Sequence, residues 1–486
     1  MSSIDEIRDT RIKKLKLLKE RGMNPYPAES KREMSLLDAV HNFEDLERQK
    51  DSKWIAGRIM SIRGQGAIVF ITLNDGTGSF QGLLKKDVIG EEKFDLWNET
   101  VDIGDFVEIH GTFFITKRGE KTMEAGDWRI LSKSLLPLPE KWHGLQDAEE
   151  RFRKRYLDIL MNPGIKELLE KKTKFWDTAR SFMKKHGFLE IETPTLEITT
   201  GGAEATPFKT YNEDFNLSLY LRISVGELWQ KRLMAAGFSK TFEIGRAYRN
   251  EGSDANHLQE FTNLEFYWAY ANYKDGMKLT EKLYKKIAQD VFGTMKFETR
   301  GHKFDLEKTW PSIDYREVVK QETSIDILNT TYDEVKNKLD NLNIVYDGDT
   351  MERLVDTLWK YCRKKISGPV FLTGHPKLVS PLSKSMSDNP DLTERFQIII
   401  AGSEVGNGFS ELNDPLDQAA RFEVQQELLK RGDKEAMMPD DEFVEMLEYG
   451  MPPTCGFGFG EMLFAFLADK PVRETQFFPL MKPKLN

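Results

Sequence analysis

The sequence predicts an α+β protein made of two parts: a small five-stranded β-barrel and, after it, a larger antiparallel sheet flanked by helices. Three observations support this prediction. The 486 residues are too many for one ordinary hydrophobic core. Short β-rich runs separated by turn signals crowd into residues 53–135. Beyond about residue 161, helical and β-rich segments alternate with long loops, and several β-rich segments look antiparallel.

The composition excludes several classes of protein. Hydrophobic residues make up 39% of the chain and charged residues 31%, as in folded soluble domains. The formal net charge of -9 neither supports nor excludes nucleic-acid binding, because only the contact face must attract phosphate. Cys362 and Cys455 form no CxxC pair, so a structural zinc site is not expected. Free thiols, no apolar signal region and no long apolar run predict a cytoplasmic protein without a membrane segment.

Residues 1–49 are expected to form an N-terminal helical arm. Apolar residues at helical spacing and several lysines predict a basic helix over residues 4–22, which ends at Gly22. A solvated amphipathic helix and an arm on RNA phosphates both fit this pattern, and composition alone favours the first.

Five β-rich runs over residues 50–137 predict a small closed barrel such as an OB-fold. The runs are WIAGRIMSI, AIVFITL, SFQGLL, DFVEIHGTFFI and TMEAGDWRI, separated by the turn signals RGQG, NDGTG, IGD and KRGE. Barrels of this kind commonly hold single-stranded nucleic acid by stacking bases on aromatic side chains. The strand pattern alone does not require that function.

The second part is expected to be a catalytic domain over residues 161–486, joined by a linker at 138–160 and carrying a helical insertion at about 308–390. Neither a Walker A sequence nor a GxGxxG fingerprint is present, so any nucleotide is bound without those phosphate loops. The expected strands are YLRIS, KTFEIGRAY, FTNLEFYWAY, FQIIIAGSEV and FGFGEMLFAF.

A strand–loop–strand segment at residues 242–267 carries side chains suited to a nucleotide. Arg249 can clamp a phosphate, Phe261 can stack on adenine, and Glu251 can accept a hydrogen bond from an exocyclic amine. The alternative is a surface hairpin with routine ion pairs, which this segment taken alone would favour.

Three further segments have two interpretations each. Glu404 and Glu411 flank a glycine-rich turn and suit Mg²⁺ or an ammonium group, or else Asn413, Asp414 and Pro415 simply cap the following helix. Glycines alternate with aromatics at 452–467, where a ligand can approach the backbone, or where a strand and a helix pack tightly. The loop with Gly201 and Gly202 either closes over a substrate or is an ordinary loop.

Taken in order, these segments resemble the class II aminoacyl-tRNA synthetases. HGFLEIETPTL resembles motif 1, which builds the dimer interface; FEIGRAYRNEG with HLQEFT resembles motif 2; and GFGFGE before an apolar helix resembles motif 3. A barrel before the catalytic domain is the subgroup IIb arrangement. Within it the lysyl type matches best and over nearly the whole chain, through NPYP, LPLPEKWHGLQDAEERFRKRYLDIL, GGAEATPF, LVSPLSKSMSDNPDLTERF and GNGFSELNDPLDQAARF.

The resemblance implies a ligase that joins lysine to tRNA(Lys) through a lysyl-adenylate, with ATP, Mg²⁺ and a homodimer formed through motif 1. Arg249, Glu251 and Glu404 would be catalytic. Position by position it implies ATP binding by Arg249, Glu251, His257, Phe261 and Glu404; lysine binding by Gly202, Glu227, Arg249, Glu265, Tyr267, Asn407, Phe409 and Glu411; metal binding by Glu404 and Gln397; and anticodon reading by Arg63, Phe70, Gln81 and Glu120.

The lysine assignment also makes physical sense. A buried ammonium needs acceptors, which Glu265, Tyr267 and Glu411 supply. An aspartyl or asparaginyl pocket, which is one alternative, would want a cation or an amide reader there instead.

Two departures from the family pattern leave a second alternative. Motif 3 normally continues with an arginine that holds ATP, but Met462 follows Glu461 here. Gln397 stands where a metal-binding glutamate is common. A catalytically weak paralogue that only binds tRNA or lysine is therefore the competing hypothesis.

Overall fold

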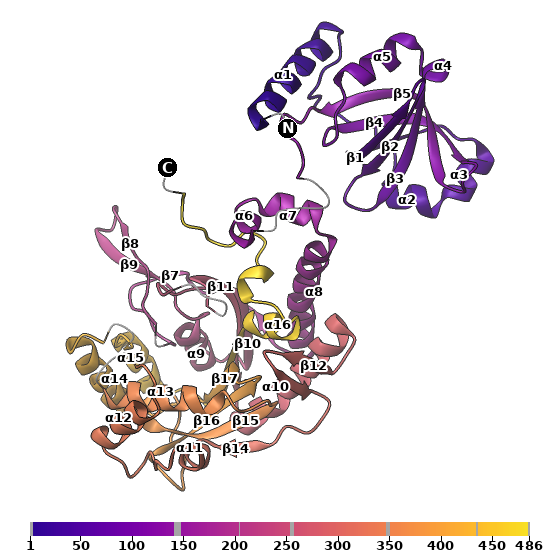
Figure 1. Cartoon of the computed structure of the whole chain (residues 1–486). Helices are drawn as coiled ribbons and strands as arrows, with labels where there is room; N and C mark the ends of the chain where they lie inside the picture. The colour runs from indigo at the N-terminus through magenta and orange to yellow at the C-terminus, as the bar shows by residue number, and fades with distance from the viewer. Residues whose placement is uncertain are drawn as a thin grey trace. The chain divides into compact units, whose positions relative to one another are not determined.

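The computed structural model describes residues 3–139, 147–203, 205–252, 257–346, 350–433 and 436–484. Backbone contacts divide the chain into two compact units, Met1–Met161 and Asn162–Asn486 (Figure 1). Each unit has its own hydrophobic core and is described by itself. No helix in the described ranges combines the length and the apolar character needed to cross a bilayer.

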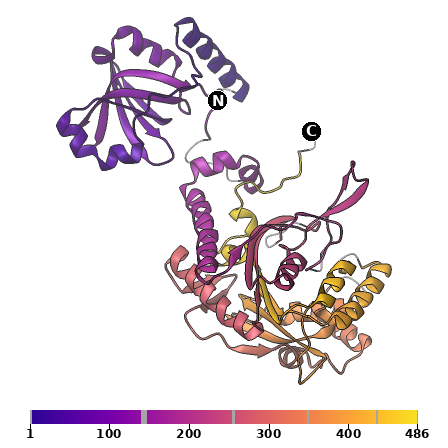
Figure 2. The ribbon, with the colours of Figure 1, turned by 180° about the vertical axis from the view of Figure 1, so that it is seen from behind.

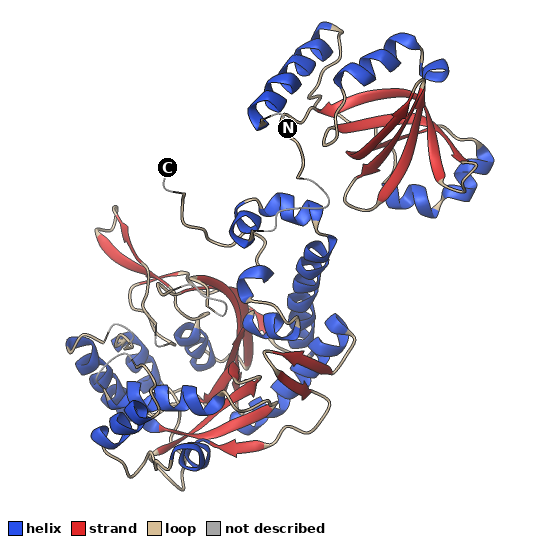
Figure 3. Cartoon of the chain, in the orientation of Figure 1, coloured by secondary structure: helices blue, strands red, loops and turns tan. Residues whose placement is uncertain are grey.

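The first unit is built on a closed five-stranded barrel with strand order β1-β2-β3-β5-β4 (Figure 3). Neighbouring strands are antiparallel except β3 and β5. Residues such as Ile55, Leu84 and Ala125 point inward and are fully buried. The predicted barrel is confirmed, since each of the five β-rich runs is one strand. The strands are β1 Lys53–Gln65, β2 Ile68–Asn74, β3 Ser79–Lys85, β4 Phe106–Ile115 and β5 Lys121–Ser132.

The N-terminal helix α1, Ile4–Glu20, packs against this barrel. It starts at a capping box formed by Ser3 and Glu6, and its Leu18 is buried in the barrel core. Six shorter helices belong to the same unit. These are α2 Leu36–His41, α3 Phe43–Gln49, α4 Lys86–Ile89, α5 Glu91–Thr100, α6 Ala148–Arg153 and α7 Arg155–Met161.

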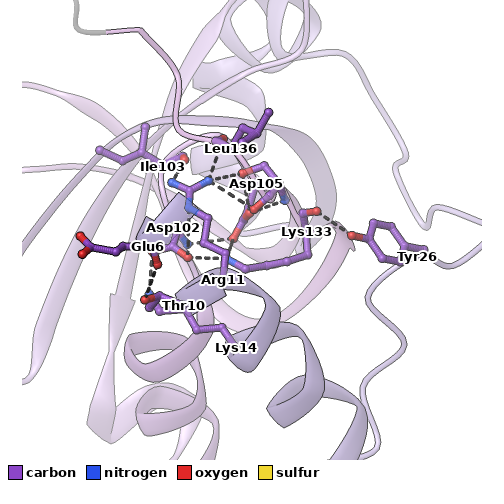
Figure 4. A network of polar contacts seen from close by, with 11 residues as sticks. Glu6, Thr10, Arg11, Lys14, Tyr26, Asp102, Ile103, Asp105, Lys133 and Leu136 are labelled. Atoms are coloured by element: carbon purple, nitrogen blue, oxygen red, sulfur yellow. Dashed lines mark hydrogen bonds and ion pairs between the residues drawn. The ribbon is translucent and has the colours of Figure 1, made fainter. Parts of the chain in front are cut away.

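A buried polar network attaches α1 to the barrel (Figure 4). The guanidinium of Arg11 donates to the hydroxyl of Ser134 and to three backbone carbonyls. Lys14 donates to Asp102 at 2.6 Å, and the buried Lys133 joins Asp102 to Asp105. Two basic residues of the helix are therefore engaged by the barrel, whereas Lys13, Lys16 and Lys19 are exposed.

The second unit is built on an eight-stranded sheet with strand order β14-β15-β16-β17-β18-β11-β10-β6. All neighbours are antiparallel except the two outermost pairs. The predicted antiparallel sheet is confirmed. The strands are β6 Leu189–Glu190, β10 Lys240–Tyr248, β11 Glu260–Ala269, β14 Ser312–Asp314, β15 Val370–Pro376, β16 Leu392–Ile400, β17 Ser403–Ser410 and β18 Thr454–Gly460; small sheets contain β7 Leu196–Glu197, β8 Lys209–Asn212, β9 Leu217–Leu221, β12 Lys296–Thr299 and β13 His302–Asp305.

Helices cover both faces of this sheet (Figures 1 and 2). On one face α8, α10 and α16 pack on a core rich in phenylalanine. On the other face α9, α14 and α15 surround a smaller apolar cluster that includes Tyr267 and Phe409. The helices are α8 Pro163–Lys185, α9 Glu227–Ala235, α10 Tyr273–Ile287, α11 Tyr315–Thr323, α12 Tyr332–Asn341, α13 Met351–Arg363, α14 Pro415–Lys430, α15 Asp441–Tyr449 and α16 Met462–Leu467, with short turns at Ala288–Phe292, Lys377–Val379 and Val472–Thr475.

Four expected segments differ from the structure. Only the first two residues of the run YLRIS belong to a strand, the end of β9 in a small sheet. The run FQIIIAGSEV is not one strand but the hairpin of β16 and β17, because Ala401 and Gly402 have φ of 48° and 71° and reverse the chain. The run FGFGEMLFAF leaves the sheet at Gly460 and continues as α16. Residues 308–390 contain α11, α12 and α13, but also β14 and β15 of the main sheet.

Candidate active site

Cross-strand register creates the candidate site. Gln397, Asn407, Gly458 and Glu265 stand in one row across β16, β17, β18 and β11. Residues directly opposite one another in neighbouring strands point to the same face of a sheet. The next site-facing row is Arg395, Phe409, Gly456 and Tyr267, and between the two rows Phe396, Gly408, Phe457 and Phe266 face the phenylalanine core.

The glycines of β18 leave the room that the site needs. A Cβ atom at Gly456 would lie 2.1 Å from Oε1 of Glu411 and 2.6 Å from the ring of Tyr267. A Cβ atom at Gly458 would lie 3.0 Å from Cγ of Glu265. The alternation of glycine and aromatic residues therefore serves both faces of the strand, since each intervening phenylalanine fills the core.

Glu265 is a buried carboxylate held by three donors. Its Oε1 accepts from the backbone N–H of Val225 at 2.7 Å and from the amide of Asn263 at 3.0 Å, and its Oε2 accepts from the hydroxyl of Tyr267 at 3.4 Å. Burial, with the nearby charge of Glu227, raises the pKa of Glu265 to about 7. A cation beside this carboxylate would favour its ionised form.

Glu411 and Glu227 share one buried lysine. Nζ of Lys231 lies 2.6 Å from Oε2 of Glu411 and 2.8 Å from Oε1 of Glu227. Burial raises the pKa of Glu411 to about 8, against the lowering effect of Lys231. Oε1 of Glu411 has no hydrogen-bond partner within the described ranges. This oxygen is an acceptor available to a ligand.

Lys231 was not predicted from the sequence. Burial alone lowers its pKa, but the carboxylates of Glu227 and Glu411 outweigh that effect and raise it. One signal was present: Lys231 follows Glu227 by four residues, which places both side chains on one face of a helix.

The loop at Gly202 comes into contact with the start of α9. Gly202 has φ of 89°, and a Cβ atom there would lie 2.7 Å from Cβ of Glu227. The hydroxyl of Ser224 donates to the carbonyl of Gly201 at 2.9 Å. Only glycine fits this approach, so Gly202 and Glu227 lie side by side at the pocket.

A second cluster, on the same face, contains the residues expected to hold ATP. The guanidinium of Arg249 lies 5.2 Å from the centre of the Phe261 ring, and its charge is among those that lower the pKa of Glu404. Burial has the larger, opposite effect and raises that pKa. Glu404 accepts from the side-chain amide of Gln397 at 2.6 Å. Glu251 and His257 are exposed and flank residues 253–256, which lie outside the described ranges.

Met462 begins α16 just beyond the Phe261 side of this cluster. A Cβ atom at Gly460 would lie 3.7 Å from the ring of Phe261, and Met462 itself is partly buried against the core. The preceding Glu461 is buried and paired with Lys172 of α8. The charge of Lys172 is therefore already matched by a carboxylate.

In the barrel unit, the four residues expected to read an anticodon lie near one another. Arg63 stands directly opposite Phe70, and its guanidinium donates to the side chain of Gln81 at 3.4 Å. The Gln81 amide donates to Thr122 at 2.8 Å, whose hydroxyl donates to the carbonyl of Glu120. Arg63 and Glu120 are exposed, whereas Phe70 and Gln81 are half-buried.

Comparison with known proteins agrees with both units. A family model described as tRNA synthetases class II (D, K and N) matches residues 147–482. A model described as OB-fold nucleic acid binding domain matches residues 53–131.

Proteins that are similar to this chain over its full length include several named lysine–tRNA ligase. The lysine–tRNA ligase of Thermotoga maritima is 40% identical over 487 residues, which cover 99% of this chain and 97% of the relative. The lysine–tRNA ligases of Pelotomaculum thermopropionicum and Halalkalibacterium halodurans are each 40% identical, over 99% of this chain and 96% and 98% of their own lengths. The chain therefore belongs to the class II tRNA synthetases of the D, K and N group.

Proposed function

We propose that this protein activates lysine with ATP to lysyl-adenylate and transfers the lysyl group to the 3′ end of tRNA(Lys). The observation that carries the proposal is the pair of buried carboxylates, Glu265 and Glu411, on a glycine floor, with Oε1 of Glu411 free of a partner within the described ranges. Such acceptors suit an ammonium group. An aspartyl pocket would need a free cation for the substrate carboxylate, but Lys231 is already engaged by two carboxylates, and an asparaginyl pocket would need an amide reader in place of a carboxylate pair.

With the substrate ε-ammonium at Glu265 and Glu411, roles can be assigned to the other pocket residues. Glu227 and Gly202 would hold the α-amino group of lysine, and Arg249 its carboxylate. Glu265, Tyr267 and Glu411 would hold the ε-ammonium, and Asn407 and Phe409 would shape its surroundings.

ATP would bind at the second cluster, with adenine on Phe261, phosphate on Arg249, and Glu251 and His257 at the rim. Oε1 of Gln397 is buried and lacks a hydrogen-bond partner within the described ranges, and Nε2 of the same amide donates to the Glu404 carboxylate. These oxygens fit Mg²⁺, which takes oxygen ligands and often binds through one or two protein groups plus phosphate. Bound there, Mg²⁺ would neutralise phosphate charge. No group of three or more acidic, histidine or cysteine side chains that could hold a metal occurs in the described ranges.

The chemistry would rest on positioning and charge neutralisation. The lysine carboxylate attacks the α-phosphorus in line, the bond to pyrophosphate breaks, and Arg249 stabilises the charge on the phosphoryl oxygens. In the second step a hydroxyl of the tRNA 3′ end attacks the carbonyl carbon and AMP leaves. No covalent enzyme intermediate is required.

The remaining parts of the chain would serve tRNA binding and assembly. We assign residues 1–49 to an N-terminal arm, 50–137 to the anticodon-binding barrel and 161–486 to catalysis, with Arg63, Phe70, Gln81 and Glu120 reading the anticodon. Residues 186–196, which resemble motif 1, would form a homodimer interface, since Leu189, Leu196 and the neighbouring Ile198 are exposed apolar residues. Both cysteines are free, which suits the reducing cytoplasm where we expect the protein to act.

Lysine-dependent exchange between ATP and pyrophosphate tests the proposal, followed by charging of tRNA(Lys). Exchange with lysine but not with aspartate or asparagine is expected. Exchange that depends on another amino acid would overturn the assignment. No exchange at all would restore the binding-only alternative raised by Met462, which the full-length similarity to lysine–tRNA ligases does not favour.

A further inference from the structure

Lys231 lies inside the pocket that we assign to the substrate lysine, although no motif pointed to it. Its side chain is 1% exposed, and the rings of Phe409, Phe443 and Tyr267 surround its ammonium at 5.4, 5.8 and 6.0 Å. Both charged partners, Glu227 and Glu411, are buried as well. Water therefore does little to screen the charges of this group.

The charges of the pocket can be counted. When ionised, Glu227, Glu265 and Glu411 carry three negative charges, and Lys231 returns one positive charge, which leaves two negative charges. Nearby Glu243 is matched by Arg222 at 2.7 Å and adds nothing. Burial raises the pKa of Glu197 to about 8, so this neighbour is mostly neutral at pH 7. Free lysine carries two ammonium groups, and its carboxylate is assigned to Arg249.

We propose that Lys231 is a specificity-determining positioning residue, a fixed counter-ion that sets the ionised pocket to two negative charges and favours ionisation of Glu411 when a substrate with two ammonium groups binds. This inference rests on the proposed function. Oε2 of Glu411 lies beside the ammonium of Lys231, and Oε1 is available. One carboxylate can therefore contact both Lys231 and the substrate ammonium.

The reason lies in the repulsion among buried carboxylates. Like charges that share a dry site cannot all ionise easily, so without Lys231 the carboxyl groups of the pocket would hold their protons to a higher pH and offer fewer charged acceptors. Glu411 faces Glu227 and Lys231 from α9, Glu265 and Tyr267 from β11, and Cys455 from β18. Lys231 is the cation among these groups, and it opposes the effect of burial on the pKa of Glu411.

The test compares the full-length parent with Lys231→Met, which keeps a similar chain length but removes the charge. Exchange kinetics are measured at varied lysine, varied ATP and pH 6–9. The KM for lysine should rise at least about tenfold, with the KM for ATP little changed. In the pH profile of kcat/KM for lysine, the rising limb should move to higher pH by about one unit or more, because loss of the Lys231 charge raises the pKa values of the carboxyl groups.

Two further variants keep the test decisive. Lys133→Met removes another fully buried lysine that joins two carboxylates, but in the barrel unit, and should lower thermal stability without changing the KM for lysine or its pH dependence. Lys231→Met combined with Glu227→Gln removes one positive and one negative charge together. The ionised pocket then again carries two negative charges, those of Glu265 and Glu411. The pH limb of this double variant should return toward that of the parent, even though the lost contact of Glu227 keeps the KM high.

Several outcomes would overturn the proposal. A lower KM for lysine in Lys231→Met would mean that the ammonium of Lys231 competes with the substrate. An unchanged KM and pH limb, with reduced stability alone, would leave Lys231 a structural residue. A double variant whose pH limb stays shifted would rule out charge balance as the cause. If the parent itself shows no lysine-dependent exchange, the proposed function fails first, and separately.

Discussion

Buried carboxylates determine what the site can bind. Glu265 and Glu411 are both fully enclosed, yet each keeps polar partners, because an unpaired buried charge would be too costly. Their raised pKa values, about 7 and about 8, are the consequence of that enclosure. A cation that enters the pocket would recover part of the cost, so we expect this pocket to select for ammonium groups.

Glu411→Gln should raise the KM for lysine. The amide keeps the shape of the carboxylate but loses its charge, so binding of the ε-ammonium should weaken by about 2–5 kcal/mol. Exchange kinetics at varied lysine measure the effect, and the KM for ATP should change little. Glu423→Gln, an exposed change on α14, is the matched control and should behave like the parent.

The stabilisation that lysine gives the protein should grow with pH. Because the pKa values of Glu265 and Glu411 are raised on folding, their contribution to the stability of the ligand-free protein is present at low pH and is lost as pH rises through 7–8. Bound lysine favours the ionised carboxylates and offsets this loss. Thermal unfolding with saturating lysine should therefore show a larger shift in Tm at pH 8.5 than at pH 6.5.

Norleucine is the control for this pH dependence, since it has the same chain without the ε-ammonium. Its effect on Tm should not increase over the same range. A lysine effect that is flat or falls between pH 6.5 and 8.5 would mean that these carboxylates do not contact the ammonium.

Met462→Arg should raise the rate of lysyl-adenylate formation, chiefly through a lower KM for ATP. A guanidinium at this position would offset phosphate charge in a partly dry site, where one preorganised donor is worth on the order of 10²–10³ in rate. Lys172, the nearby cation, is already paired with Glu461. Exchange kinetics at varied ATP make the comparison, with the uncharged Met462→Leu as control. A parent that is already fast at low ATP, and that arginine does not improve, would show that another group compensates.

At the scale of strands and helices, local patterns predicted much of what the structure contains. β-rich runs separated by turn signals marked all five barrel strands, and β-rich runs also marked β10 and β11. The alternation of side chains along a strand placed glycines on one face of β18 and phenylalanines on the other.

Long-range pairing was less accessible from the sequence. The run from Phe396 to Val405 contains one turn signal, Gly402 followed by Ser403, but a single glycine inside a β-rich run also fits a bulge, so the reversal that separates β16 from β17 was not predicted. Lys231 was missed for a related reason, since its partner Glu411 lies 180 residues away in sequence and only the fold brings them together. Local periodicity predicts which face of a helix or strand a residue occupies, but it does not predict which distant residue the fold brings into contact with it.

Phe70, on the outer face of β2, can be used to test the proposed anticodon site. Phe70→Ala should weaken binding of tRNA(Lys) by roughly 1–3 kcal/mol through lost base stacking, and should leave lysine-dependent exchange nearly unchanged. Phe70 is half-buried and lies outside the buried barrel core, so its removal should cost little stability. Filter binding and thermal unfolding measure the two effects.

Ile71→Ala gives the contrast in the same strand. Ile71 is fully buried in the barrel core, so its truncation should cost about 2–5 kcal/mol of stability. If Phe70→Ala destabilises the protein as much as Ile71→Ala does, then Phe70 is a core residue and not a stacking platform.

For the whole molecule, the two units divide the work that the proposed function requires. Each has its own buried core, so changes on the barrel face need not disturb the chemistry of the sheet. The barrel unit would recognise the tRNA, and the second unit would form the adenylate. Assembly is the remaining property at this scale, and the exposed apolar side chains of Leu189, Leu196 and Ile198 favour a homodimer.

The protein should run in solution as a dimer of its 56.2 kDa chain, and Ile198→Asp should shift it toward the monomer. Ile198 is 63% exposed beside the exposed Leu196, an arrangement that a second copy would cover by burying apolar surface, whereas a carboxylate there would be left without a partner. Light scattering coupled to gel filtration over a range of concentrations gives the mass directly. Tyr449→Asp, at an 86% exposed site at the end of α15, is the control and should remain dimeric. A parent that supports lysine-dependent exchange while it remains a monomer throughout would rule out this interface.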